Sequence, residues 1–146
     1  MRELPRQLSV EELAALFEGR TRFVELLAER ERPLDSARAL LDELPEGGQL
    51  AVLDAHPAIG VRGGLSAASA REQGSENDHG VLAELAELNR RYEKRFGFRF
   101  VVFVNGRPRS AIVPVLRERL ERTREQELAT ALDELVAIAQ DRWRRG

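Results

Sequence analysis

The segment TREQELATALDELVAIAQ, residues 123–140, decides the fold class of this chain. Thr123 and Gln126 stand at the spacing at which two side chains satisfy free backbone N–H groups at the start of a helix. Apolar residues then recur every three to four positions, which is typical of the buried face of a helix. These residues are Leu128, Leu132, Leu135, Ile138, Ala139 and Trp143. We therefore expect a long terminal helix with this face turned inward and with Glu and Arg on its other faces.

Similar helix signals precede this segment. Ser9 and Glu12 have the spacing of a capping box, Thr21 can cap a second helix, and Asp35 or Ser36 can cap a third. Apolar residues at helical spacing follow each signal: Leu13, Leu16 and Phe17; then Phe23, Leu26 and Leu27; then Ala37, Leu40, Leu41 and Leu44.

The middle of the chain continues the pattern. The sequence PEGG, residues 45–48, ends the third helix, and a short helix then leads to a histidine. An amphipathic stripe covers residues 81–96, and residues 112–120 form a shorter helix that Pro114 can distort. We predict an all-α fold, a single-domain bundle of about seven to eight helices over residues 1–146.

The run FRFVVFV, residues 98–104, does not fit the helical pattern. It is aromatic and β-branched, and it ends at Asn105-Gly106, a strong turn dipeptide. One strand alone cannot form a sheet. The run therefore either pairs with another copy of the chain or lies extended across a helical core.

Composition narrows the class of protein. A chain of 146 residues can bury a core without disulfides, and it contains no cysteine, which excludes thiolate metal sites and a cysteine nucleophile. The formal net charge of −2 gives no general electrostatic reason to bind nucleic acid or an anionic membrane. No apolar run is long enough to span a bilayer or to form a signal peptide. We expect a soluble, cytoplasmic protein.

His56 is the sharpest candidate for chemistry. It opens the sequence HPAIG, residues 56–60, and a residue before proline is biased away from helix, so His56 should project from a helix end into a loop. An imidazole exchanges protons near neutral pH and can serve as a general acid or base. The alternative is that His56 is a C-terminal cap whose charge faces the helix dipole.

For the other polar residues, a purely structural role competes with a role in binding or catalysis. Glu72 and Gln73 could hold amide or ureido groups, although Ser69 and Glu72 also have capping-box spacing. His79 lies in a polar stretch, and we expect it to be solvated. With only two histidines and no close-spaced pair, a metal site is not expected. The arginines between residues 107 and 124 alternate with glutamates, which favours pairing on helix surfaces over RNA binding.

Four motifs in order resemble the OHCU decarboxylases, which act on 2-oxo-4-hydroxy-4-carboxy-5-ureidoimidazoline (OHCU) in urate breakdown. They are HPAIG, then Ser69-x-x-Glu72-Gln73, then LNRRYEKRFGFRFVVFV (88–104), then RERLERTREQELATALDELVAIAQDRW (117–143). The resemblance extends from Phe17 almost to the C-terminus. It departs at Arg99, where the family more often has proline, and in a shortened loop over residues 74–80.

The resemblance implies a cofactor-free, all-helical enzyme, commonly a homodimer, that decarboxylates OHCU to (S)-allantoin. His56 would be the general acid, Glu72 would orient the ureido and ring N–H groups, Gln73 and Ser69 would add hydrogen bonds, and Pro57 would shape the pocket. The pocket would also be lined by the backbone of Phe100, Val101, Val102, Phe103 and Val104.

Two other functions remain open from the sequence. The first is a non-catalytic helical module that binds a partner protein through the FRFVVFV run. The second is a decarboxylase or lyase that acts on a related cyclic ureide.

Overall fold

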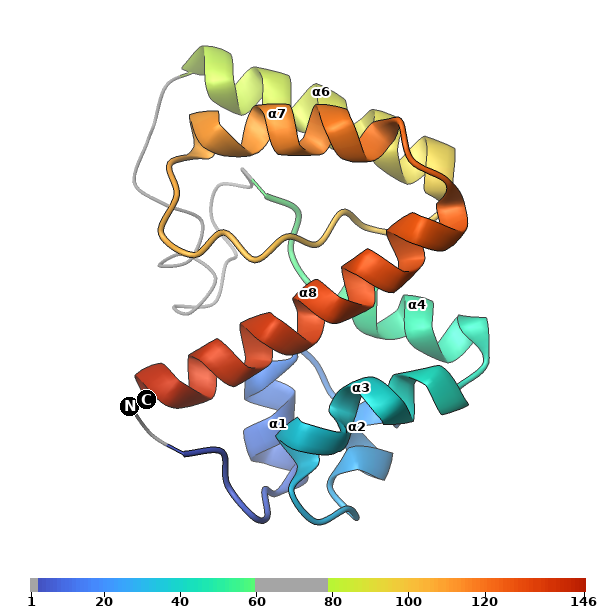
Figure 1. Ribbon diagram of the computed structural model, residues 1–146, viewed down its shortest axis with the longest axis vertical. Helices are drawn as coiled ribbons and strands as arrows, with labels where there is room; N and C mark the ends of the chain where they lie inside the picture. The colour runs from blue at the N-terminus through green and yellow to red at the C-terminus, as the bar shows by residue number, and fades with distance from the viewer. Residues whose placement is uncertain (1–2, 60–78) are drawn as a thin grey trace. The chain divides into compact units, whose positions relative to one another are not determined.

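The computed structural model describes residues 3–59 and 79–146, and Figure 1 shows how their helices follow one another. These residues form seven α-helices and no strand, so the predicted all-α class is confirmed. The helices are α1 (Val10–Leu16), α2 (Arg22–Leu27), α3 (Pro33–Glu43), α4 (Glu46–Ala55), α6 (His79–Phe96), α7 (Arg109–Leu120) and α8 (Arg124–Arg145). None of these helices combines the length and the apolar character that crossing a membrane requires.

The chain divides into two units. The first contains residues 1–56 together with residues 132–146, and the second contains residues 57–131. The boundary between them falls inside α8, so this helix contributes its first turns to one unit and the remainder to the other.

In the first unit, α2 packs against α1, α3 and α4. Two helix starts are as predicted. The Ser9 hydroxyl accepts from the Glu12 N–H while the Glu12 carboxylate accepts from the Ser9 N–H, and the Thr21 hydroxyl accepts from the Val24 N–H. Val24 joins Phe23 and Leu27 on the buried face of α2, in place of the expected Leu26.

The predicted start of α3 was wrong. We expected Asp35 or Ser36 as the cap, but the helix begins at Pro33, with Arg32 before it in the left-handed conformation, at φ 49° and ψ 57°. Proline suits the first helical position because its φ is already helical and the N–H that it lacks would have no partner there. The Arg32 Nε donates to the Asp35 carboxylate at 2.9 Å, so Asp35 binds a side chain in the first turn.

The last part of α8 ties the end of the chain to its beginning. Gln140 Nε2 donates to the Leu34 carbonyl at 2.8 Å, and Trp143 Nε1 donates to the Glu3 carbonyl at 2.8 Å. Of the predicted apolar face, Leu132, Leu135, Ile138 and Ala139 are buried, whereas Leu128 and Trp143 are partly exposed. Long-range contacts of this kind explain why residues 132–146 belong to the first unit.

In the second unit, α6 and α7 lie side by side (Figure 1). The predicted stripe of α6 is buried at Leu82, Leu85, Leu88, Tyr92 and Phe96. Gly97 then ends the helix at φ 81°, a conformation that glycine adopts without strain.

Residues 98–104, which we call the extended segment, join α6 to the turn before α7. They form neither helix nor strand, and Phe98 and Phe100 lie with their ring centroids 5.9 and 5.2 Å from that of Tyr92. Asn105 and Gly106 follow with φ of 51° and 77°, and the Arg107 N–H donates to the Val104 carbonyl. Two successive positive φ values are the signature of the turn that Asn-Gly predicts.

Helix α7 begins earlier than expected. We predicted residues 112–120, but the helix starts at Arg109, after Pro108 as its N-cap residue. Pro114 therefore lies beyond the first turn, where it cannot donate the usual hydrogen bond to the carbonyl four residues before it.

Candidate functional site

His56 ends α4. Its backbone is extended, at φ −74° and ψ 142°, and its N–H donates to the Leu53 carbonyl at 3.1 Å. This is the conformation that the following Pro57 imposes, and the predicted place of His56 at a helix end is confirmed. The residue is only 5% exposed, so the imidazole is largely removed from solvent.

Asn89 anchors the stretch that follows His56. Its Nδ2 donates to the Ile59 carbonyl at 3.2 Å and to the Leu85 carbonyl of its own helix at 2.9 Å. Its Oδ1 is buried and has no hydrogen-bond partner in the described part of the chain. Asn89 therefore fixes the backbone at Ile59, three residues beyond His56, and its Oδ1 is still able to accept a hydrogen bond.

Most of the extended segment is buried, yet the backbone N–H groups of residues 100–104 donate no hydrogen bond within the described part of the chain. Phe100, Val101, Val102 and Val104 are each less than a tenth exposed. Among the hydrogen bonds formed within the described residues, none is donated by a backbone N–H of residues 100–104. Buried backbone N–H groups in proteins are almost always paired, so this row of donors is a candidate binding element.

Three of the segment's carbonyls, by contrast, accept hydrogen bonds from arginine. Arg119 Nη1 donates to the Val101 carbonyl at 2.8 Å. Arg107 donates from Nη2 to the Phe103 carbonyl at 2.7 Å and from Nε to the Val104 carbonyl at 2.9 Å. The guanidinium groups thus satisfy acceptors and add positive charge beside the segment.

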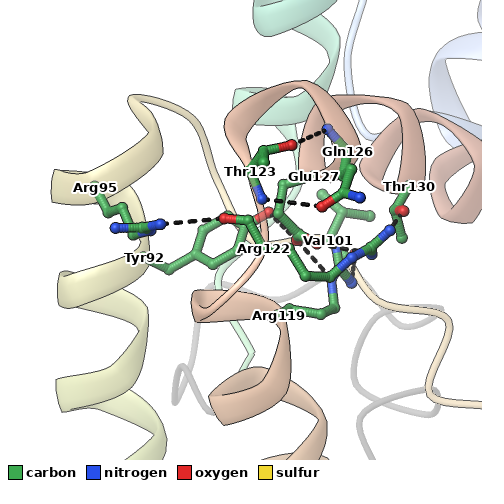
Figure 2. Close-up of polar contacts among 9 residues, drawn as sticks. All are labelled: Tyr92, Arg95, Val101, Arg119, Arg122, Thr123, Gln126, Glu127 and Thr130. Atoms are coloured by element: carbon green, nitrogen blue, oxygen red, sulfur yellow. Dashed lines mark hydrogen bonds and ion pairs between the residues drawn. The ribbon is translucent and has the colours of Figure 1, made fainter.

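A buried polar network centred on Glu127 holds Arg119 in place (Figure 2). One oxygen of this carboxylate accepts from the Tyr92 hydroxyl at 2.6 Å and from Arg119 Nε at 2.7 Å, and the other accepts from Arg122 Nη1 at 2.9 Å. Arg122 also donates to the Thr130 hydroxyl at 2.9 Å. The network joins α6, α7, the start of α8 and the extended segment within the second unit.

The environment of the network controls its protonation. Tyr92 and Glu127 are fully buried and Arg119 is 5% exposed. Burial, and then the hydrogen bond that Tyr92 donates to Glu127, raise the pKa of Tyr92 well above its ordinary value. Tyr92 therefore stays a neutral donor, and the carboxylate between two guanidinium groups has the paired charge that burial demands.

We did not predict these residues as part of a site, and we expected the arginines of this region to pair on helix surfaces. For Arg119 and Arg122 that expectation was wrong, because both pair with buried Glu127. A signal was present in the sequence. Glu127 stands four residues before Ala131 and eight before Leu135, on the apolar stripe of α8, and Asn89 interrupts the stripe of α6 in the same way.

Of the other predicted site residues, the structure describes some and not others. Pro57 follows His56 directly and is partly exposed. Ser69, Glu72 and Gln73 lie outside the described residues, as does the shortened loop up to residue 78. Residues 3–59 and 79–146 contain no group of three or more His, Asp or Glu side chains that could hold a metal ion.

The fold is that of an all-α enzyme class with solved members. The structure is similar to a crystal structure of an OHCU decarboxylase determined in the presence of (S)-allantoin, with a TM-score of 0.76 and 25% identity, over 90% of this chain and 94% of the other. A family model described as OHCU decarboxylase matches residues 2–144. The chain therefore belongs to the OHCU decarboxylase family.

Curated relatives agree with this assignment. The chain is 37% identical over 109 residues to the 2-oxo-4-hydroxy-4-carboxy-5-ureidoimidazoline decarboxylase of Mus musculus, a match that covers 69% of this chain and 61% of the mouse protein. It is 30% identical over 142 residues to the uric acid degradation bifunctional protein of Bacillus sp. (strain TB-90), covering 87% of this chain and 27% of that protein. The match thus spans about three fifths of the length of the mouse relative.

Proposed function

We propose that this protein decarboxylates OHCU to (S)-allantoin in urate degradation, without a cofactor. The observation that carries the proposal is the family match over residues 2–144. The likeness to a decarboxylase structure determined in the presence of (S)-allantoin supports the same activity. On this proposal the enzyme is a carboxy-lyase.

His56 is the general acid in the proposed reaction. The bond between the ring carbon and its carboxylate breaks, carbon dioxide leaves, and the electron pair stays on the carbon. His56 then protonates that carbon from one side, which yields a single enantiomer. Its burial at the fixed end of α4 supports this role, because a proton donor has to be held in one position to be selective.

The remaining roles concern substrate binding. Glu72 orients the ureido and ring N–H groups, Ser69 and Gln73 add hydrogen bonds, and Pro57 shapes the pocket. The extended segment lines it with peptide groups. The N–H groups of residues 100–104, which donate no hydrogen bond within the described residues, support this part of the proposal, since preorganised donors stabilise charge that develops when carbon dioxide leaves.

The proposal is tested by supplying the protein with freshly generated OHCU and following circular dichroism of the allantoin formed. We expect a faster reaction and an optically active product. A rate and an enantiomer mixture equal to those of spontaneous decay would refute the proposal. A panel of other cyclic ureides, assayed in parallel, identifies a related lyase activity if OHCU itself is not turned over.

We further propose that the protein is a cytoplasmic homodimer. The absence of cysteine in the chain is compatible with a reducing compartment. Sedimentation equilibrium tests the dimer directly, because the monomer mass is 16.5 kDa. A single species of that mass at assay concentrations would exclude the dimer.

A further inference from the structure

Over residues 101–103, the carbonyls that accept hydrogen bonds lie on one edge of the extended segment. In an extended backbone the N–H and C=O of one residue point the same way, and successive residues point to opposite sides. The carbonyls of Val101 and Phe103 therefore share an edge, and both accept from arginine, at 2.8 and 2.7 Å. The peptide groups of Val102 lie on the opposite edge, and within the described residues neither its N–H nor its C=O forms a hydrogen bond.

Val102 thus offers a donor and an acceptor side by side. A ureide carries the complementary pair, an N–H next to a C=O, and two such groups can exchange both hydrogen bonds as paired strands do. Carboxylates and simple carbonyls lack the donor. The edge is therefore suited to a ureide more than to an anion alone.

Arg119 is the residue that fixes this orientation. Its guanidinium carbon lies 4.6 Å from the Phe100 ring centroid, its Nε is bound by Glu127 at 2.7 Å, and its Nη1 binds the Val101 carbonyl. Since Tyr92 and Arg122 hold the same Glu127 carboxylate, the guanidinium has little freedom to move. A rotation of the Val101 carbonyl would break a buried charge-assisted hydrogen bond, which is among the stronger bonds in proteins.

The network is not optimised for stability alone. Arg119 Nη2 is buried and has no hydrogen-bond partner among the described residues. An unsatisfied buried donor is destabilising, so a network that only stabilised the fold would be expected to satisfy it. The arrangement is better explained by the position at which the guanidinium is held.

We propose that Arg119, held by Glu127, is a positioning residue that binds the Val101 carbonyl and so turns the Val102 peptide edge towards the ureide of the substrate. This inference rests on the proposed function for the identity of the substrate. It assigns Arg119 no contact with the reacting atoms. Its effect passes through the backbone of the extended segment.

The test compares two arginines that bind the same carboxylate. Arg119→Met removes the bond to Val101, whereas Arg122→Met removes bonds to Glu127 and Thr130 and leaves the extended segment untouched. We expect Arg119→Met to lower kcat/KM for OHCU about 100-fold, the effect of a misplacement of about 1 Å, mainly through a higher KM. Arg122→Met keeps both Arg119 bonds, to Glu127 and to the Val101 carbonyl, so it should lower kcat/KM far less than Arg119→Met does, and both variants should be folded by circular dichroism.

Arg119→Lys provides a second measurement if Arg119→Met does not fold. Lysine keeps a cation near Glu127 but lacks the fork that binds two acceptors at once, so kcat/KM should again fall and KM rise. The inference is wrong if the folded variant of Arg119 has the kcat/KM of the unmodified protein, or if it and Arg122→Met lose activity in proportion to their losses of stability.

A binding measurement separates this inference from the proposed function. In an NMR titration with (S)-allantoin, the Val102 amide resonance should shift in the unmodified protein and in Arg122→Met but not in Arg119→Met or Arg119→Lys. This result would support Arg119 as the positioning residue even if the protein does not turn over OHCU. A lack of OHCU turnover would refute the proposed function and leave this inference standing. The inference would be overturned if (S)-allantoin left the Val102 amide resonance in place in all four proteins, or moved it equally in all four.

Discussion

Individual residues carry the clearest physical signals in this protein, and Tyr92 is one of them. It is the only tyrosine of the chain, it is fully buried, and its hydroxyl donates to Glu127 at 2.6 Å. Ionisation would place two negative charges next to each other in the core. Burial and this hydrogen bond accordingly raise the pKa of Tyr92 well above 10.0.

This shift predicts a loss of stability at high pH. In the unfolded chain Tyr92 ionises near pH 10, while in the folded protein it keeps its proton, so the unfolded state binds fewer protons above that pH. The contribution of Tyr92 to stability is therefore complete below about pH 10, and above it the free energy of unfolding should fall by about 1.4 kcal/mol per pH unit. Urea unfolding at several pH values measures this slope.

Tyr92→Phe is the control, because it should lack this component of the slope. Absorbance at 295 nm follows the ionisation itself, since no other tyrosine contributes. A tyrosine that titrates near pH 10 while the protein remains folded would contradict the assignment of Tyr92 to a buried network.

His56 is the second residue whose replacement is decisive. We expect His56→Ala to lower kcat for OHCU by about 10²–10⁴-fold, the usual contribution of a general acid, while the far-ultraviolet circular dichroism stays unchanged. His79→Ala, which replaces the only other histidine, should retain activity. An active His56→Ala enzyme would remove His56 from the mechanism.

At the scale of elements, local signals predicted more than distant ones. The capping residues Ser9, Thr21 and Thr123 were found correctly, because a cap bonds to a backbone group only three residues away. The start of α3 was missed since a left-handed Arg32 followed by proline competes with the caps downstream. The sequence predicted that residues 98–104 break the helical pattern, and it left open whether they pair with another copy or lie extended across a helical core; in the described chain they have no strand partner.

In the candidate site, too, the features set by neighbouring residues were predictable and those set by distant residues were not. The place of His56 at a helix end follows from Pro57, its neighbour. The Glu127 network could not be assembled from the sequence, because Tyr92 and Glu127 are 35 residues apart and only the tertiary fold brings them together. Glu127 was visible as a charged residue on an apolar stripe, but nothing local identified its partners.

Two glycines give a prediction at this scale. Gly106 has a φ of +77°, so Gly106→Ala should destabilise the protein by about 1–2 kcal/mol even though an added Cβ would meet no atom within 4 Å. Gly47 also has space around it but lies in α4, where Gly47→Ala should stabilise by about 0.4–1 kcal/mol. Thermal unfolding measures both. A neutral or stabilising Gly106→Ala would show that the Asn105-Gly106 turn does not require its positive φ.

At the scale of the whole molecule, α8 links distant parts of the sequence. Arg142 lies near the end of α8, where it pairs with Glu18 at 3.0 Å and donates to the Leu16 carbonyl at 3.0 Å. Both side chains of the pair are mostly buried. The prediction that residues 1–146 form a single domain stays a prediction, and unfolding of both units in one cooperative transition would support it.

The Arg142 pair predicts unequal effects of two changes one helical turn apart. Arg142→Met should destabilise by about 3–5 kcal/mol, because it leaves a largely buried Glu18 carboxylate without this partner. Arg145→Met removes an exposed pair with Asp141 and should cost less than about 1 kcal/mol. Chemical denaturation measures both values, and equal losses would mean that the Arg142 contacts do not hold the first unit together.

The division of α8 between the two units also has a consequence for the synthesis of the protein. Chains are made from the N-terminus at about 5–20 residues per second, and domains usually fold as they emerge from the ribosome. Residues 1–56 cannot do so completely, because their packing partners include residues 132–146. The nascent chain therefore carries α1 to α4 with part of their apolar surface uncovered while the second unit is being made. The apolar contacts of these four helices are completed only when the last turns of α8 have been added.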